Sequence, residues 1–317
     1  MQMSRRALLA AASALTATGL PRAWAGAGAD GKFTVAFAGS MGVVMDEGVG
    51  PAFQAKSGAQ YQGIGQAAMA LAHLLSAKTM MADVFIPVSP APMKAVEEAG
   101  LVDEGQGIPV ASTQIVLAYS PASKFAAAIA KAGTKAGAKS GGAAWTKILQ
   151  EPGFRFGRTD PTTDPQGQYV LYTLQLAEML YKMPGLAKTI AGPDVNEAQI
   201  FTEPSLLSRL QEGQIDATLG YQSAVVSQKL PFIALPSEIN FSDPSKNKDW
   251  YSKASLTLTS KGTSKTLHPG LLVFYAAALK NATNPTAAQG FVDFLASQTG
   301  QAIFAEYGYG PARGPKI

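Results

Sequence analysis

The polar run at residues 157–169 is the segment of this chain best suited to hold a charged ligand. Its sequence, GRTDPTTDPQGQY, places two Asp-Pro pairs and a glycine directly before an apolar-periodic stretch typical of a helix. An Asp-Pro pair favours extended and turn geometry, so we expect a strand-to-helix loop with outward-facing backbone amides. Amides at the start of a helix attract anions because they lack partners and carry partial positive charge. The run therefore predicts an anion-binding loop, with an ordinary turn as the alternative.

Strands and helices alternate along the rest of the chain, which predicts a parallel α/β sheet. Strands are expected at 32–38, up to 65, and at 83–88, 115–119, 154–157, 215–219 and 271–279. Helices are expected at 43–57, from 66 onward, and at 92–99, 169–183, 205–212, 286–296 and 300–307.

Small or polar residues lie at the ends of most of the expected strands. They are Ser40, Gly65, Gln66, Ser89, Thr113, Asp160 and Tyr221. Ligands of open α/β sheets bind outside the carboxyl ends of the strands, so these residues could converge on one cleft. Hydroxyl groups and the backbone amides near Gly65 and Gln166 are neutral donors that hold an oxyanion without a counter-charge.

The residue inventory gives little support for catalysis. The chain has no cysteine and only two isolated histidines, His73 and His268, so thiolate sites and nucleophilic triads are improbable. No phosphate-binding loop, serine-hydrolase elbow or zinc motif occurs. We therefore expect a protein that is not an enzyme and uses no cofactor. An exported hydrolase that uses Asp160, Asp164 or Glu203 is the remaining alternative.

The first 25 residues have the features of an export signal. An arginine pair, Arg5 and Arg6, precedes a short apolar stretch, and a small-x-small site ends at Ala25. We expect a cleaved twin-arginine signal and a periplasmic protein. Three of the 26 basic residues and none of the 22 acidic residues lie in the signal, so the mature chain carries only +1. That charge argues against a nucleic-acid partner.

Several segments of the chain resemble one family of binding proteins. They are the run 157–167, the sequence LGYQS at 219–223 and the sequence LPSEIN at 235–240. With these segments the chain resembles the periplasmic molybdate/tungstate-binding proteins of ABC transporters, and most closely the archaeal-type branch. The resemblance covers nearly all of the mature chain.

The resemblance implies an α/β fold of the two-lobed type II periplasmic-binding-protein class, with a two-crossing hinge. Lobe I would comprise residues 26–115 plus 272–317, and lobe II residues 116–271. The family binds its oxyanion in the cleft between the lobes and presents it to a membrane permease. The protein would act as a monomer.

The resemblance also assigns roles to individual residues. Ser40 matches a serine that contacts the oxyanion, whereas Gly65 and Gln66 stand where the family usually has serine. Asp160 matches an acidic residue that can contact the metal centre directly, and Gln166 matches a backbone donor. Glu203 matches a position at a helix start that faces the cleft, and Tyr221 matches a tyrosine near the ligand.

One position departs from the archaeal-type pattern. Gly220 stands where those members carry a second metal-ligating glutamate. With Asp160 as the single carboxylate, we expect at most five ligands around the metal and more readily a tetrahedral anion. The departure also leaves room for another small anion, and the same fold serves sensors that dock on a membrane receptor.

Overall fold

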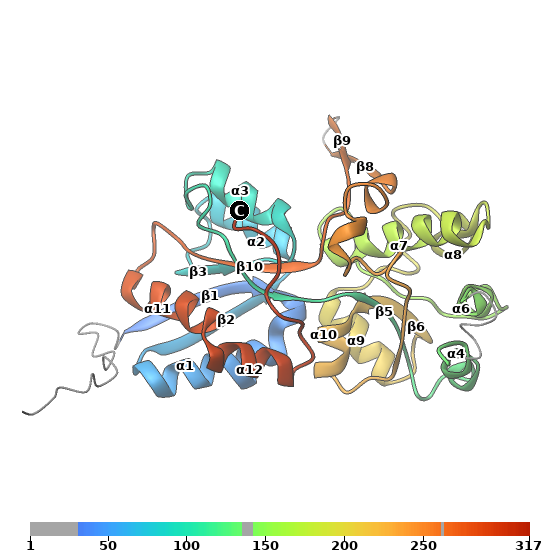
Figure 1. Cartoon of the computed structure of the whole chain (residues 1–317), viewed down its shortest axis with the longest axis horizontal. Coiled ribbons are helices and arrows are strands. Elements are labelled where there is room, and N and C mark those ends of the chain that lie inside the picture. The colour runs from blue at the N-terminus through green and yellow to red at the C-terminus, as the bar shows by residue number, and fades with distance from the viewer. Residues whose placement is uncertain (1–30, 135–141, 261–262) are drawn as a thin grey trace, which may run out of the picture.

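The computed structural model describes residues 31–134, 142–260 and 263–317, so the predicted signal peptide and its cleavage site lie outside the described residues. Two separate sheets organise this part of the chain (Figure 1). We call the five-stranded sheet with its helices lobe I and the three-stranded sheet with its helices lobe II. Among the described residues, no helix is long and apolar enough to cross a membrane.

Lobe I contains strands in the order β2-β1-β3-β10-β4. They are β1 (Lys32–Ala38), β2 (Gln60–Gln66), β3 (Val84–Ile86), β4 (Ile108–Ser112) and β10 (Val273–Ala278). The first three strands are parallel, and β10 is antiparallel to both β3 and β4.

Both faces of this sheet are covered by helices. Phe33 on β1 packs against Phe53 of α1 (Gly50–Ser57) and Phe291 of α11 (Pro285–Ala296). Ala36, on the opposite face of β1, lies in a second cluster with Leu71 and Leu75. Further helices are α2 (Ala68–Ser76), α3 (Pro90–Glu98) and α12 (Gln298–Glu306). Burial on both faces explains why β1 reads as an almost continuous apolar strand.

Lobe II has the strand order β6-β5-β7. Its strands are β5 (Ile115–Tyr119), β6 (Ala217–Tyr221) and β7 (Phe232–Ala234). Its helices are α4 (Ala126–Ala132), α6 (Ala144–Ile148), α7 (Pro165–Tyr181), α8 (Leu186–Ala191), α9 (Glu203–Gln211) and α10 (Gln222–Ser227). A hairpin of β8 (Leu256–Ser260) and β9 (Thr263–Leu267) stands out from this lobe (Figure 1).

The expectation of a parallel sheet is wrong for lobe II, since β5 is antiparallel to both β6 and β7. The reason is that β5 starts only two residues after β4 and runs away from lobe I, whereas β6 and β7 run back toward lobe I. The strand expected at 154–157 is also wrong. That segment makes only a single bridge, from Phe156 to Ala217, and Arg158, directly after it, makes another to Ile200.

The chain passes between the lobes near Thr113 and again near Leu272, and the Thr113 N–H donates to the Leu272 carbonyl at 3.0 Å. The C-terminal segment returns past these crossings and ends beside α3 (Figure 1). It is bound by paired backbone bonds to both ends of the β4 segment, between Ser112 and Gly310 and between Gly107, just before β4, and Ile317.

Candidate functional site

Ser40 marks the point where lobe I meets lobe II. It lies on a short turn, Gly39–Met41, that directly follows β1 and contacts both α9 and α10. The residue is 6% exposed, and its hydroxyl finds no hydrogen-bond partner among the described residues. Because an unpaired buried hydroxyl is costly, this group is a candidate ligand contact.

Glu203 reaches the same turn from lobe II. It is the first residue of α9, and its carboxyl group lies close to the Ser40 N–H. A Cβ atom at Gly39 would lie 3.1 Å from Glu203 Oε2, so the glycine permits this close approach. Burial, followed by the charge of Asp164, raises the pKa of Glu203 well above its ordinary value.

Asp164 supplies a second carboxylate. It caps the N-terminus of α7 by accepting the Gln166 N–H at 2.9 Å, which is the favoured role of an aspartate before Pro165. Burial raises its pKa to about 6, although the Gln166 hydrogen bond opposes that shift.

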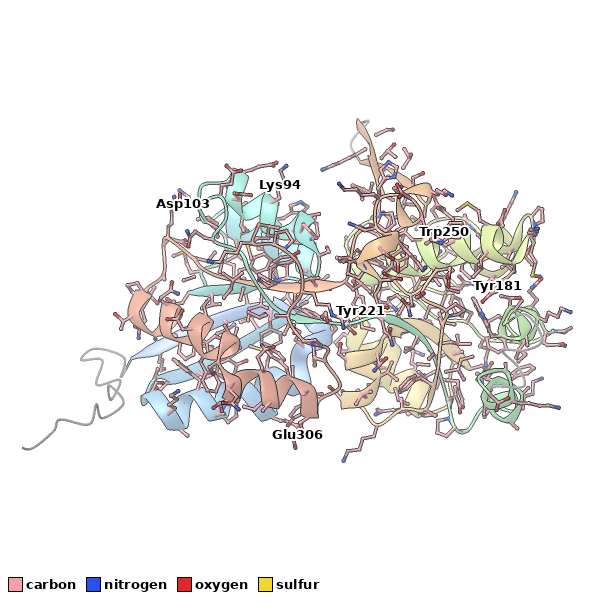
Figure 2. All side chains as sticks on the ribbon, viewed as in Figure 1. Lys94, Asp103, Tyr181, Tyr221, Trp250 and Glu306 are labelled. Carbon is pink, nitrogen blue, oxygen red and sulfur yellow. The ribbon has the colours of Figure 1, made fainter. Side chains whose placement is uncertain are left out.

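Tyr221 lies at the end of β6, at the junction of the two lobes (Figure 2). Its hydroxyl is buried and, like that of Ser40, has no partner among the described residues. Burial, then the charges of Asp164 and Glu203, raises the pKa of Tyr221 well above its ordinary value. The phenol therefore stays protonated and can act as a donor.

A cavity of about 320 Å³ opens beside this cluster. Its walls include Ser40 and Asp46 from lobe I and Glu203 and Leu207 from lobe II. The site thus combines unpaired hydroxyl groups with carboxyl groups of raised pKa in a cleft between two sheets. Such a set can donate to the oxygens of an anion while its carboxyl groups either donate as acids or bind an electropositive central atom.

Comparison with known families decides the class of protein. A family model described as bacterial extracellular solute-binding protein matches residues 33–310. This chain belongs to that family. The solute-binding protein therefore acts outside the cytoplasm.

Sequence relatives of this solute-binding protein include the molybdate/tungstate-binding protein WtpA of Pyrococcus abyssi, 31% identical over 62% of this chain and 59% of that protein. WtpA of Thermococcus kodakarensis is 29% identical over 62% of this chain and 57% of its own length. The chain thus spans about six-tenths of the length of these relatives.

Solved structures confirm the predicted fold. The periplasmic molybdate-binding protein of Azotobacter vinelandii superposes with a TM-score of 0.61 at 13% identity, covering 89% of this chain and all of that one. The sulfate-binding protein SubI of Mycobacterium tuberculosis gives 0.58 at 15% identity, covering 88% and 86%. These neighbours have the type II periplasmic-binding fold, as the resemblance implied.

The loop residues singled out in the sequence serve partly to hold the loop of the solute-binding protein. Asp160 is partly buried, and one of its oxygens accepts the N–H and hydroxyl of Thr162 at 2.8 and 2.7 Å. The Gln166 side chain accepts from Thr159 and donates to the Leu219 carbonyl at 2.6 Å. Its backbone N–H, expected to face the ligand, donates to Asp164 in this structure.

The other predicted residues lie on the elements around the cluster. Gln66 pairs with Ala38 and is exposed with Gly65 at the end of β2, next to the Ser40 turn. Ser89 precedes α3 with a φ of 72°, a left-handed conformation uncommon for serine. Thr113 accepts hydrogen bonds from the N–H and hydroxyl of Ser223.

The structure brings together Ser40, Glu203 and Tyr221 as the sequence predicted, and it adds Asp164 and Tyr309. Tyr309 donates to the Ser40 carbonyl at 3.2 Å, although 269 residues separate the two. No local pattern signals that contact. Asp164 carried a readable signal, since an Asp-Pro pair before an apolar helix predicts an N-cap.

Proposed function

We propose that this solute-binding protein captures molybdate or tungstate in the cleft between its lobes and delivers the oxyanion to an ABC permease. The observation that carries the proposal is the pair of buried, unpartnered hydroxyls of Ser40 and Tyr221 beside the carboxyl groups of Asp164 and Glu203. The names of the archaeal relatives support the choice of anion.

The carboxyl groups favour an oxyanion with a metal at its centre. A carboxylate repels the oxygens of sulfate or phosphate, whereas molybdenum and tungsten can accept a carboxylate oxygen as an additional ligand. Asp160 remains our proposed direct contact. The expectation of at most five ligands rested on Asp160 alone, and Glu203 changes that premise because it places another carboxylate at Ser40. We therefore propose that Glu203 takes the role that Gly220 leaves open.

The proposed capture needs the lobes to close. We propose that residues 26–115 plus 272–317 move against residues 116–271, that the protein is monomeric, and that a twin-arginine signal cleaved after Ala25 exports it to the periplasm. N-terminal sequencing of the secreted protein tests the cleavage site.

Isothermal titration calorimetry of the mature protein with molybdate, tungstate, sulfate and phosphate tests the function. We expect dissociation constants below 1 µM, an order-of-magnitude threshold, for the first two anions and much weaker binding of the others. Absence of submicromolar molybdate and tungstate binding refutes the proposal. Tight sulfate or phosphate binding would identify a carrier for another anion.

Transport and sensing use the same liganded form, so binding alone does not separate them. Molybdate uptake by cells that lack this chain, with and without complementation, tests delivery to a permease. Normal uptake without the chain would point to a sensor.

A further inference from the structure

The Tyr309 hydroxyl occupies a point where segments from both lobes meet. Tyr309 follows α12, is 5% exposed, and donates to the Ser40 carbonyl at 3.2 Å. Its ring packs against Phe274 of β10 and Phe304 of α12, with centroids 5.3 Å away in both cases. The ring is therefore fixed within lobe I while its hydroxyl reaches the Ser40 turn.

A second contact of the same hydroxyl reaches lobe II. The Ser223 side chain, in the first turn of α10, lies close enough to the Tyr309 hydroxyl to act on its pKa. Ser223 is fully buried and donates its N–H and hydroxyl to Thr113 Oγ1 at 3.2 and 3.1 Å. Thr113 lies on one hinge crossing and its N–H binds the Leu272 carbonyl on the other.

These contacts form one continuous series, which we call the hinge relay: Thr113, Ser223, Tyr309, Ser40 and Glu203. Its last step is the close approach of the Glu203 carboxyl group to the Ser40 N–H. The relay begins at the hinge, passes from lobe II to lobe I at Tyr309, and returns to lobe II at Glu203.

The backbone around Tyr309 has little freedom. A Cβ atom at Gly308 would lie 2.6 Å from the side chain of Val226 on α10, so this turn is pressed against lobe II. On the other side, Gly310 exchanges two backbone hydrogen bonds with Ser112, and the Ser112 hydroxyl donates to the Pro311 carbonyl. The backbone is thus held in place on both sides of Tyr309, and this fixes the position from which the side chain extends.

We propose that Tyr309 is a positioning residue that orients Ser40 for anion binding and ties that orientation to the angle of the hinge. This inference rests on the proposed function in so far as Ser40 holds the anion. A hinge movement that separates Ser223 from Tyr309 breaks the relay in its middle and frees the Ser40 turn. Binding at Ser40 and closure at the hinge are thereby coupled, and such coupling is reciprocal.

The test compares Tyr309→Phe with Tyr307→Phe. Tyr307 is partly buried two residues earlier and has no hydrogen bond to the site, so its variant is a matched control. The ligand-free readout is hydrogen exchange of the peptide covering residues 38–44. In Tyr309→Phe we expect exchange there to be about three- to tenfold faster, because one hydrogen bond contributes about 0.5–1.5 kcal/mol. Peptides from the rest of the chain should keep their exchange rates.

The ligand-bound readout is the molybdate dissociation constant. It should rise about three- to tenfold in Tyr309→Phe and stay unchanged in Tyr307→Phe. Ser223→Ala should weaken binding in the same direction, and the double variant should lose less than the sum of the two, because both act through one series of contacts.

Wild-type exchange at residues 38–44 in Tyr309→Phe overturns the inference, as does a uniform increase across all peptides, which indicates general destabilisation. If wild-type protein binds no oxyanion, the proposed function fails, yet the exchange measurement still decides whether Tyr309 positions Ser40.

Discussion

Glu203 of lobe II lies against the turn that holds Ser40 of lobe I, so a carboxyl group already stands beside the Ser40 N–H at the end of β1. The contact joins two elements that are far apart in the sequence, and it stands at the mouth of the cleft. An incoming oxyanion must share this donor with Glu203 or displace it. The identity of the side chain at position 203 therefore bears directly on anion selectivity.

Glu203→Gln should reduce selectivity. The amide oxygen can still accept the Ser40 N–H, but it no longer supplies a charged ligand to a metal centre. We expect molybdate and tungstate to bind about 10- to 100-fold more weakly, as for loss of one charged contact. Sulfate binding should be unchanged or stronger, because a repulsive charge is gone.

Calorimetry with each anion measures both effects. Glu212→Gln, an exposed change at the other end of α9, is the control and should bind as wild type. Equal loss of molybdate and sulfate binding would contradict a direct contact between Glu203 and the metal.

Asp164 should make the ligand-free protein less stable as pH rises. Burial raises its pKa from 3.8 to about 6, so the folded state binds more protons than the unfolded state between those values. The free energy of unfolding should thus fall as pH increases from about 4 to about 6, by up to about 3 kcal/mol.

Asp164→Asn keeps a good N-cap and removes the titration, so chemical denaturation at several pH values should show a flatter profile. Asp243→Asn is the control, because Asp243 caps an exposed turn in the same way. A profile as steep as wild type in Asp164→Asn would show that another group titrates.

Gly167→Ala should destabilise the loop. A Cβ atom there would lie 2.8 Å from the Pro161 nitrogen and closer still to the Thr159 carbonyl oxygen, and backbone atoms cannot move aside cheaply. Overpacking of this kind costs about 1–3 kcal/mol. Gly42→Ala, next to the Ser40 turn, meets nothing within 4 Å and has a helical φ of −46°, so it should be tolerated. Urea denaturation of the two variants separates them, and equal stability would refute the steric argument.

Arg158 should support Glu203 from a distance. The side chain is fully buried, binds Gln199 through Nε and donates from Nη2 to the Pro193 carbonyl at 2.9 Å. Its backbone also pairs with the segment that leads into α9, through Gln199 and Phe201. Arg158→Ala keeps the backbone pairing but removes the side-chain hydrogen bonds to Gln199 and Pro193 and leaves a cavity, so we expect a loss of about 3 kcal/mol and weaker molybdate binding.

Thermal unfolding and calorimetry measure the two effects of Arg158→Ala. Arg209→Ala, on the far part of α9, is the comparison. Unchanged stability in Arg158→Ala would show that segment 193–201 is held by other contacts.

The sequence predicted individual elements better than their directions. The alternation of apolar and polar residues located β1, and the short apolar run located β5, because both patterns depend only on local burial. The antiparallel pairing of β5 escaped detection, since alternation of strands and helices does not record which way a strand crosses between sheets. Predicted helix starts fell late where a proline opens the helix, as at Pro165.

The residues of the candidate site could likewise be predicted only in part from the sequence. Strand ends and a family resemblance indicated Ser40, Glu203 and Tyr221. The nearness of Asp164 to Glu203 depends on how α7 and α9 pack, and no sequence spacing records it. The Gln166 backbone N–H was expected to face the ligand, yet it donates to Asp164, and the side-chain amide joins the loop to β6. Only the three-dimensional structure shows that the Gln166 side chain lies opposite the Leu219 carbonyl of β6.

The bond between Tyr309 and Ser40 also bears on when the protein becomes competent during its biogenesis. Because 269 residues separate the partners, a ribosome must deliver nearly the whole described chain before this contact can form. The first sheet can assemble its early strands during synthesis, but the turn at Ser40 stays incomplete until the last helix has followed. The nascent chain is thus a scaffold without a finished pocket, and the pocket matures only after translation of the C-terminal segment.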